Sequence, residues 1–242
     1  MIIELAGIPI LIRNLYPDIE NLCRGYETEK SPMIRVSVSE EDIAVERKKS
    51  SQQDDINAAY PGQTASDSYL ETLAVYRKIA EQMPNYDTVL LHGSAVAVAG
   101  KAYIFIGKSG TGKSTHARLW RELLKEKAIM VNDDKPLVKV EEDGSLIVYG
   151  TPWNGKHHLS SNIAVPVHAI CALEQSEDNH ICEMSKQQAL PFLIRQIYRP
   201  GDAVALSKTL SLIDRMNVKL FRMRCNMELD AAKVSYEKMR EI

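Results

Sequence analysis

One stretch of the chain combines glycines, a lysine and hydroxyl side chains in an order that suits phosphate binding. Residues 107–114 have the sequence G-K-S-G-T-G-K-S, which fits the Walker A pattern, and they lie between an apolar and an amphipathic segment. Glycines let backbone N–H groups curl around a polyphosphate at a helix start, the lysine neutralises phosphate charge, and the serine hydroxyl reaches Mg²⁺. The alternative is a glycine-rich turn that arose by chance. We expect ATP and Mg²⁺ here, with the nucleotide held by Gly107, Ser109, Gly110, Thr111, Gly112, Lys113, Ser114 and Thr115.

Two adjacent carboxylates follow the next apolar segment. Residues 128–132 (AIMVN) predict a short strand, and Asp133 and Asp134 come directly after it, 20 residues beyond Lys113. In a β-α-β unit this end of the strand lies beside the phosphate loop. Two carboxylates there suit phosphoryl transfer, because one can bind Mg²⁺ while the other accepts the proton of an attacking hydroxyl. An ordinary Asp-Asp surface turn is the alternative interpretation.

A histidine precedes the phosphate loop on a predicted β-hairpin. Residues 88–99 predict a buried strand that returns through a two-residue Gly100-Lys101 turn into a second strand. In that register, residues whose numbers add up to 201 face one another, so His92 would lie opposite Ser109. We therefore expect His92 in the catalytic centre. The alternative is a half-buried strand histidine with a backbone partner.

Other basic and aromatic side chains are weaker candidates. Arg195 and Arg199 would lie one helical turn apart and could bind the γ-phosphate or an acidic acceptor, or else form a basic helix face. Trp153 could stack on a base or shape a substrate loop, or simply pack. Lys156 could contact the substrate or remain solvated. Of these residues, we include the two arginines among the expected catalytic residues.

The composition is that of a folded soluble protein. The 242 residues are 45% hydrophobic and 26% charged, with a net charge of −2 that excludes a bulk polyanion such as nonspecific DNA as a partner. The uncharged stretches are shorter than the roughly 20 residues that a membrane span needs. Four scattered cysteines, without CxxC spacing and without a leader-like N-terminus, predict reduced thiols in the cytoplasm. The net charges of residues 1–100, 101–184 and 185–242 are −6, −1 and +5.

The first part of the chain has the pattern of a small α+β region. An apolar run with the turn pair Ala6-Gly7 predicts a hairpin over residues 2–13. Alternating apolar residues predict a strand over residues 33–39, with a short helix between the hairpin and this strand. Residues 45–67 have almost no large apolar side chains and predict an exposed connection, after which a helix begins at Ser68. We predict a small N-terminal α+β region over residues 1–67 and a phosphate-loop domain over residues 68–242.

As a set, His92-Gly93, the Gly107–Ser114 loop and Val131-Asn-Asp-Asp134 resemble the catalytic domain of HPr kinase/phosphorylase and its smaller bacterial relatives. These belong to the phosphoenolpyruvate carboxykinase-like kinases, and residues 149–156 (YGTPWNGK) are similar to a loop of the small relatives. The resemblance spans about residues 85–230 and implies an α/β fold, with a mixed sheet in which an antiparallel hairpin leads into the phosphate loop. It also implies a homo-oligomer.

The same resemblance implies roles for individual residues. Asp133 would be the general base, supported by His92, Lys113 would bind phosphate, and Ser114 and Asp134 would bind Mg²⁺. The chain departs from the bifunctional enzyme in lacking any acidic residue over residues 144–156, where that enzyme has one for the metal. Its N-terminal domain and its HPr-gripping elements are not matched either, so the resemblance does not support phosphorolysis or HPr as the acceptor.

The sequence thus predicts a Mg²⁺-ATP-dependent kinase that phosphorylates a hydroxyl group, foremost a serine of a protein or peptide. Two alternatives stay open. One is a small-molecule kinase on the same scaffold, and the other is a non-catalytic ATP-binding accessory or regulatory protein. The aspartate pair and His92 separate these classes, because a protein that only binds ATP needs the phosphate loop but no base beside it.

Overall fold

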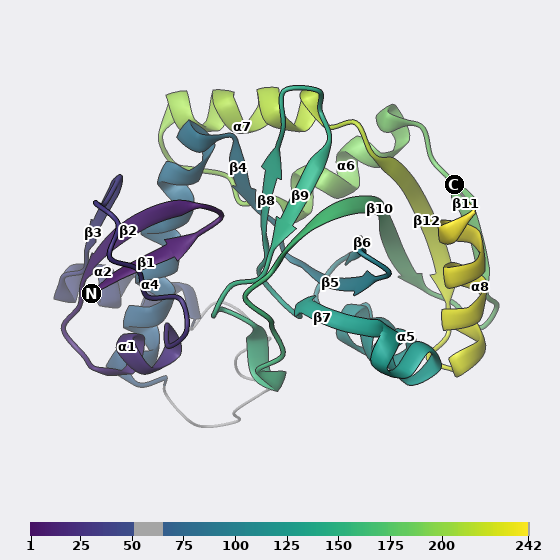
Figure 1. Ribbon diagram of the computed structural model, residues 1–242, viewed down its shortest axis with the longest axis horizontal. Coiled ribbons are helices and arrows are strands. Elements are labelled where there is room, and N and C mark those ends of the chain that lie inside the picture. Colours follow the sequence, from purple (N-terminus) through teal and green to yellow (C-terminus); the bar gives the residue numbers. More distant parts are fainter. Residues whose placement is uncertain (51–64, 242) are drawn as a thin grey trace. The chain divides into compact units, whose positions relative to one another are not determined.

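The chain forms two compact units, residues 1–82 and 83–242, in a computed structural model that describes residues 1–50 and 65–241 (Figure 1). The division falls after Gln82 and not after the exposed connection, because the helix that was expected to open the second domain packs on the first unit. Of the connection expected over residues 45–67, residues 51–64 lie outside the described residues.

The first unit is a three-stranded sheet with helices packed against it. Its elements are β1 (Ile2–Leu5), β2 (Ile8–Arg13), α1 (Asp18–Leu22), β3 (Ile34–Ser37), α2 (Glu40–Ser50) and α4 (Asp67–Gln82). The strand order is β1-β2-β3, with β1 antiparallel and β3 parallel to β2. Ala6 and Gly7 both have positive φ, which makes the tight turn that the Ala-Gly pair predicts. The predicted hairpin, short helix and strand are therefore confirmed.

Helix α2 corrects the expectation that residues 45–50 belong to an exposed connection. Only Ile43 supplies a buried aliphatic side chain, so the usual apolar periodicity is missing from the sequence. Acidic residues fill its first turn and basic residues its last turn, which suits the helix dipole. Glu46 is buried on the face that packs against α4, where Arg77 donates to it at 2.5 Å.

The second unit contains a nine-stranded mixed sheet. Its strands are β4 (Thr88–Leu90), β5 (Gly93–Val98), β6 (Lys101–Ile106), β7 (Ala128–Asn132), β8 (Leu137–Val140), β9 (Leu146–Tyr149), β10 (Ala164–Gln175), β11 (His180–Glu183) and β12 (Lys219–Cys225). The order is β4-β8-β9-β10-β6-β5-β7, and β12 joins β10 to β11. Its helices are α5 (Lys113–Leu124), α6 (Lys186–Gln196), α7 (Ala203–Arg215) and α8 (Leu229–Arg240), with 3₁₀ turns η1 (Met83–Tyr86), η2 (Lys125–Lys127) and η3 (Gly155–His157).

Alternate side chains of β6 build two cores, one on each face of the sheet. Ala102, Ile104 and Ile106 point into a core that also includes side chains of α6 and α7. Tyr103 and Phe105 point into the other core, which α5 and α8 cover together (Figure 1). Successive side chains of a strand point to opposite faces of the sheet, so this alternation decides which of the two cores each β6 side chain enters. The predicted fold class, α/β with a mixed sheet in which an antiparallel hairpin precedes the Gly107–Ser114 loop, is confirmed.

The hairpin itself differs in register from the prediction. The turn residues are Ala99 and Gly100, with φ of +50° and +76°, and Lys101 already belongs to β6. Facing residues therefore add up to 199, as in the pair of Gly93 with Ile106. Positive φ at both central residues is the geometry of the turns that match strand twist, and Ala99 adopts it beside the glycine. His92 is consequently not opposite Ser109.

The continuous strand predicted over residues 88–99 is also wrong. It is broken at Leu91 and His92, because the chain changes partners there: β4 pairs with β8, whereas β5 pairs with β6 and β7. The backbone N–H groups of these two residues bond instead to Pro136 and Gln196. The break frees the His92 side chain from the alternation of a regular strand.

Candidate functional site

The Gly107–Ser114 loop lies between the end of β6 and the start of α5, as its motif requires. Gly110 and Gly112 have φ of +75° and +101°, so both positions use the conformational freedom of glycine. The buried Lys113 side chain turns back along the loop, and its Nζ donates to the carbonyl groups of Gly107 at 2.9 Å and Lys108 at 3.2 Å. The loop therefore surrounds a lysine ammonium group.

Helix α5 begins without a side-chain cap. Gly112 is its N-cap residue and offers no side chain, so the first N–H groups of the helix face the loop without a capping oxygen from that residue. The end of the neighbouring strand β10 steadies the loop, because the Gln175 amide donates to the Gly110 carbonyl at 3.0 Å. An added Cβ at Gly107 would lie 3.0 Å from the Leu173 carbonyl, so the loop packs closely on β10. Such a helix start can hold an anion.

Strand β7 brings Asp133 to this loop. Because β5 is antiparallel to both β6 and β7, the carboxyl ends of β6 and β7 lie at one edge of the sheet. Asp133 is 7% exposed, accepts a hydrogen bond from the Ser94 hydroxyl at 2.8 Å and is also hydrogen-bonded to Ser114. Burial raises the pKa of Asp133, while these two hydrogen bonds and the charge of His157 oppose the rise.

Asp134 points to different neighbours from those of Asp133. Its Oδ1 lies 3.5 Å from His92 Nε2, its Oδ2 lies 3.5 Å from Lys135 Nζ, and its side chain is 25% exposed. The structure thus brings His92 to the aspartate pair, but beside Asp134 and not Asp133. The main-chain bonds of this corner, from Gly93 N–H to the Asp134 carbonyl and from His92 N–H to Gln196, hold the arrangement in place.

Asn132 and Ser94 support the aspartates, and sequence reasoning did not single out either of them. The fully buried Asn132 amide donates to the Thr151 and Trp153 carbonyls, and its oxygen accepts hydrogen bonds from the N–H groups of Asp134 and Lys135 at 2.9 and 2.7 Å. The signal in the sequence is a polar residue at the end of an apolar strand or within one. Asn132 closes AIMVN, and Ser94 interrupts residues 88–99, which are otherwise mostly apolar.

The structure does not place Arg195 and Arg199 as predicted. Helix α6 ends at Gln196, and Ile197 forms an isolated bridge with Leu91, so the two arginines are not one helical turn apart. The Tyr198 N–H bonds to the Leu90 carbonyl, which continues the extended segment along β4. Both arginine side chains are exposed. The pairing with β4 overrides the helical spacing that the sequence favoured.

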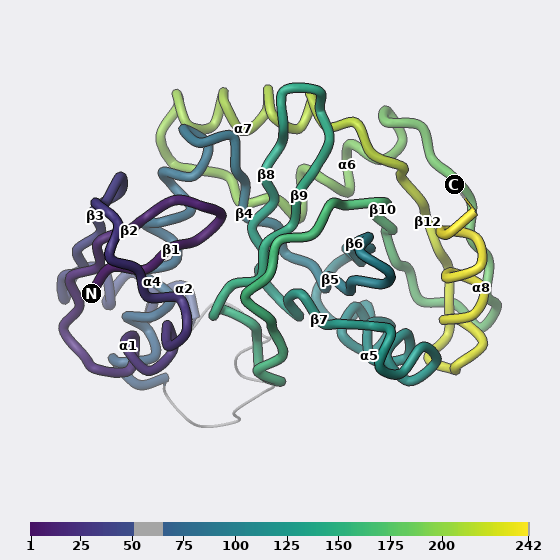
Figure 2. The backbone as a smooth tube through the Cα atoms, viewed as in Figure 1, coloured from purple at the N-terminus to yellow at the C-terminus, as the bar shows by residue number. Residues whose placement is uncertain are grey.

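The loop over residues 151–161, here called the 151–161 loop, lies next to the aspartates. It can be followed from the end of β9 to the start of β10 in Figure 2. The Asp133 N–H bonds to the Leu159 carbonyl at 3.1 Å, and the Ser161 N–H bonds to the Val131 carbonyl at 3.1 Å. Trp153 is buried at 5% exposure, which favours its packing role, whereas Lys156 is exposed.

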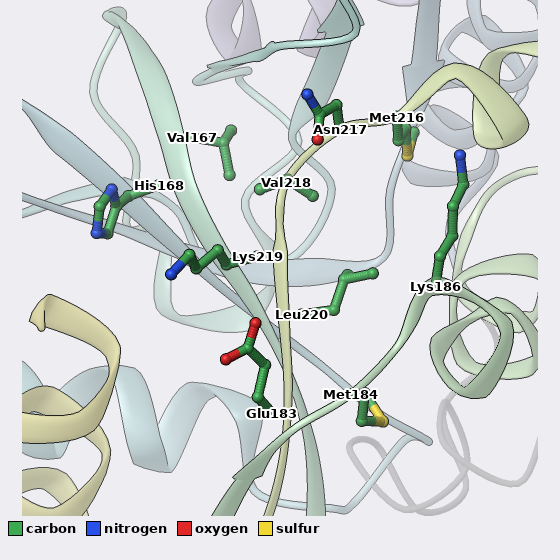
Figure 3. Close-up of a pocket in the computed structure, with 10 residues that line it drawn as sticks. All are labelled: Val167, His168, Glu183, Met184, Lys186, Met216, Asn217, Val218, Lys219 and Leu220. Carbon is green, nitrogen blue, oxygen red and sulfur yellow. The ribbon is translucent and has the colours of Figure 1, made fainter. Parts of the chain in front are cut away.

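A separate hollow of about 430 Å³ lies near the start of β12 (Figure 3). His168, Glu183 and Lys219 line one part of it, and Val218 and Leu220 line another. Because β6, β10 and β12 are parallel, their amino ends lie at the edge of the sheet opposite to the Gly107–Ser114 loop. The hollow therefore does not belong to the candidate site.

The donor groups at the loop fit a magnesium ion that is bound together with phosphate. The Ser114 hydroxyl and the Asp133 carboxylate share a hydrogen bond, and both are hard oxygen donors. Among the described residues, no three His, Cys, Asp or Glu side chains gather as a ready-made metal site. A Mg²⁺ ion that takes only one or two protein oxygens and fills its other positions with phosphate and water needs no such cluster.

The candidate site can now be compared with known proteins. A family model described as SynChlorMet cassette protein ScmC matches residues 62–228, and the chain belongs to that family. A search of curated proteins found no match. Among the described residues, no helix combines the length and apolar character of a membrane span.

One solved structure similar to the chain is described as the Hpr(Ser) kinase/phosphatase from Coxiella burnetii. It matches 62% of this chain and 98% of its own chain, with 13% sequence identity and a TM-score of 0.35. A similarity this low supports no conclusion about the site. The roles of the site residues therefore have to be argued from their own chemistry and geometry.

Proposed function

We propose that this protein is a Mg²⁺-ATP-dependent phosphotransferase that transfers the γ-phosphoryl group to a hydroxyl, foremost a serine of a protein or peptide. One observation carries the proposal. A Walker A loop and a pair of carboxylates meet at one edge of the sheet, with Asp133 hydrogen-bonded to Ser114 of the loop. A protein that only binds ATP would need the loop, but not the second carboxylate and the histidine beside it.

The loop residues would bind the nucleotide. Backbone N–H groups from Gly112 to Thr115 would donate to the phosphate oxygens at the start of α5, and Lys113 would exchange its contacts with loop carbonyls for the β- and γ-phosphates. Ser114 and Asp133 would hold Mg²⁺, which supplies positive charge against the phosphates. The hydrogen bond between these two side chains supports this choice.

The same geometry favours a division of roles opposite to the one that the resemblance implied. Asp133 is buried against the loop hydroxyl, whereas Asp134 is more exposed and lies beside His92. We assign the proton-accepting role to Asp134. As the acceptor oxygen forms its bond to the γ-phosphorus and the bond to the bridging oxygen of ADP breaks, the hydroxyl proton moves to Asp134. His92 stabilises the carboxylate and orients it.

Three single variants test the proposal. Lys113→Ala is expected to weaken ATP binding at least about tenfold, because it removes the charge in the loop. Asp133→Asn should raise the Mg²⁺ concentration needed for nucleotide binding, whereas Asp134→Asn should bind Mg²⁺-ATP normally and lose transfer by about 100-fold or more. Calorimetric titration with ATP measures binding, and transfer of label from radioactive ATP in a lysate of the source organism measures activity.

Two results would contradict the proposal. Unchanged ATP affinity in Lys113→Ala would remove the nucleotide site. The second result is that Asp134→Asn transfers phosphate like the wild type while Asp133→Asn loses transfer at saturating Mg²⁺. That result would show that Asp133 is the general base.

A further inference from the structure

The 151–161 loop carries three consecutive basic residues and lies against the aspartate pair, and this arrangement bears on the acceptor. Asn132 fastens the first part of the loop through Thr151 and Trp153, and Asp133 fastens the last part through Leu159. The loop between these attachments includes η3 and the sequence Gly155-Lys-His-His158. Its position is therefore set by the residues that flank the reacting carboxylate.

Gly155 determines how close the loop comes. Its φ is +68°, and an added Cβ would lie 3.0 Å from Asp134 Cβ. A larger residue would need either the loop or Asp134 to move. Because Gly155 lies against the proposed base, the three basic residues that follow it begin at the rim of the site. All three, Lys156, His157 and His158, are exposed.

Acidic residues are scarce in the sequence around the basic side chains of this rim. The sequence contains no Asp or Glu from Gly144 to Leu173. Among the described residues, neither Lys156 nor His158 has an ion-pair partner, and His157 interacts electrostatically with Asp133. An exposed lysine of this kind is fully available to an anion that binds beside Asp134.

The nucleotide does not account for this charge. Its phosphates are served by the N–H groups at the start of α5, by Lys113 and by Mg²⁺, all on the side of Asp133 that faces Ser114. Gly155, in contrast, contacts Asp134, the carboxylate that we assign to the acceptor hydroxyl. A basic rim on that side attracts an acceptor with negative charge next to its hydroxyl.

We infer that the acceptor is a serine in an acidic peptide segment, and that Lys156 and His158 bind the carboxylates flanking that serine. This inference rests on the proposed function, because it names the substrate class of the same site. Recognition is expected to be electrostatic, so it weakens as ionic strength rises. The two side chains position the acceptor and take no part in the transfer of the proton.

Two fluorescent peptides test the inference. They share a central serine and differ only in flanking residues, Asp and Glu in one and Lys in the other. With Mg²⁺ and ADP bound, we expect the acidic peptide to bind the full-length protein at least about tenfold more tightly by fluorescence anisotropy, and this preference should shrink in 0.5 M salt. The double variant K156Q/H158Q should lose the preference and keep its affinity for ADP. Lys127→Gln, an exposed lysine in η2 beyond the far end of α5, is the matched control and should keep the preference.

The outcomes separate the two proposals. Equal binding of the two peptides, or tighter binding of the basic one, overturns the inference. So does a preference that survives in K156Q/H158Q. A preference for the acidic peptide that disappears in K156Q/H158Q supports the inference even if no label is transferred. In that case the failure belongs to the proposed phosphotransferase function. Transfer to serine with no preference for acidic neighbours supports the phosphotransferase function and overturns the inference about the acceptor.

Discussion

Glu71 in the first unit and Asp133 in the second are both buried carboxylates, and their partners differ in kind. Glu71 accepts hydrogen bonds from two backbone N–H groups, those of Leu15 at 2.5 Å and Tyr16 at 2.9 Å, and so holds a turn in place. Asp133 is bonded to two hydroxyl groups, and one of these belongs to the Gly107–Ser114 loop. Burial of a carboxylate is therefore not itself a sign of a functional site, and the nature of its partners is what distinguishes the two.

The comparison predicts opposite consequences for removing each group. Glu71→Ala leaves two backbone donors without an acceptor and is expected to lower the free energy of unfolding by about 2–4 kcal/mol. Asp133→Asn keeps the shape and an acceptor oxygen, so stability should change little while transfer at limiting Mg²⁺ falls by about 100-fold or more. Denaturant titration of both variants measures the first quantity, and the lysate transfer assay measures the second. A loss of ATP affinity in Glu71→Ala, with the second unit still folded, would break the comparison.

A third buried ionisable side chain, that of His116, is a base and can be compared with the two carboxylates. His116 in α5 is 2% exposed, and its Nε2 lies 2.8 Å from the Ser235 hydroxyl of α8. Burial lowers the pKa of His116 to about 4. A folded-state pKa below the unfolded value means that stability is lost as pH falls from about 6.5 toward 4, because the unfolded chain takes up the proton first.

His116→Leu removes that proton uptake. The Trp120 indole N–H keeps its bond to Ser235 in the variant. Between pH 7 and pH 5, we expect the stability of the variant relative to the wild type to rise by about 1–2 kcal/mol. Chemical denaturation at the two pH values provides the measurement. Parallel pH profiles for the two proteins would show that His116 has the same pKa in the folded and unfolded states.

The smallest effect is expected for Ser94→Ala, which tests the hydrogen bond between Ser94 and Asp133 directly. In Ser94→Ala, Asp133 loses the 2.8 Å hydrogen bond that favours its ionised form but keeps Ser114. Transfer at neutral pH should fall about tenfold, with the pH profile moved to higher pH, while ATP affinity without Mg²⁺ stays unchanged. Ser94→Thr, which keeps the hydroxyl, is the control. An unaltered pH profile in Ser94→Ala would mean that Ser94 only fills space.

Much of the fold could be predicted from local patterns. Short apolar runs predict β1, β2 and β7, and alternation predicts β3, with nearly correct ends, because each signal lies within a few residues. Helix α2 escaped prediction because its stability comes from charge placement and from contacts with α4. The break at His92 escaped because a change of strand partners leaves no trace in a run of apolar residues.

The sequence predicted which residues form the candidate site better than it predicted which of them contact one another. The order of glycines, lysine and serine over residues 107–114 determines the loop, because few other residues permit that backbone and that charge. The position of Asp133 and Asp134 after an apolar strand brings them to the same edge, since β6 and β7 run in the same direction. Which aspartate faces Ser114 and which faces His92 could not be read from the sequence, because both contacts join segments far apart in the chain.

The sequence by itself therefore determined the Gly107–Ser114 loop, the carboxylate pair and the α/β class, because these depend on short-range pattern and on residue chemistry. Only the tertiary structure decided that Asn132 fastens the 151–161 loop, that Gly155 lies against Asp134 and that the chain leaves α6 at Ile197, which bridges Leu91. Those contacts join segments far apart in the chain. Side chains and backbone groups that meet in this way satisfy hydrogen bonds and packing that no local pattern encodes.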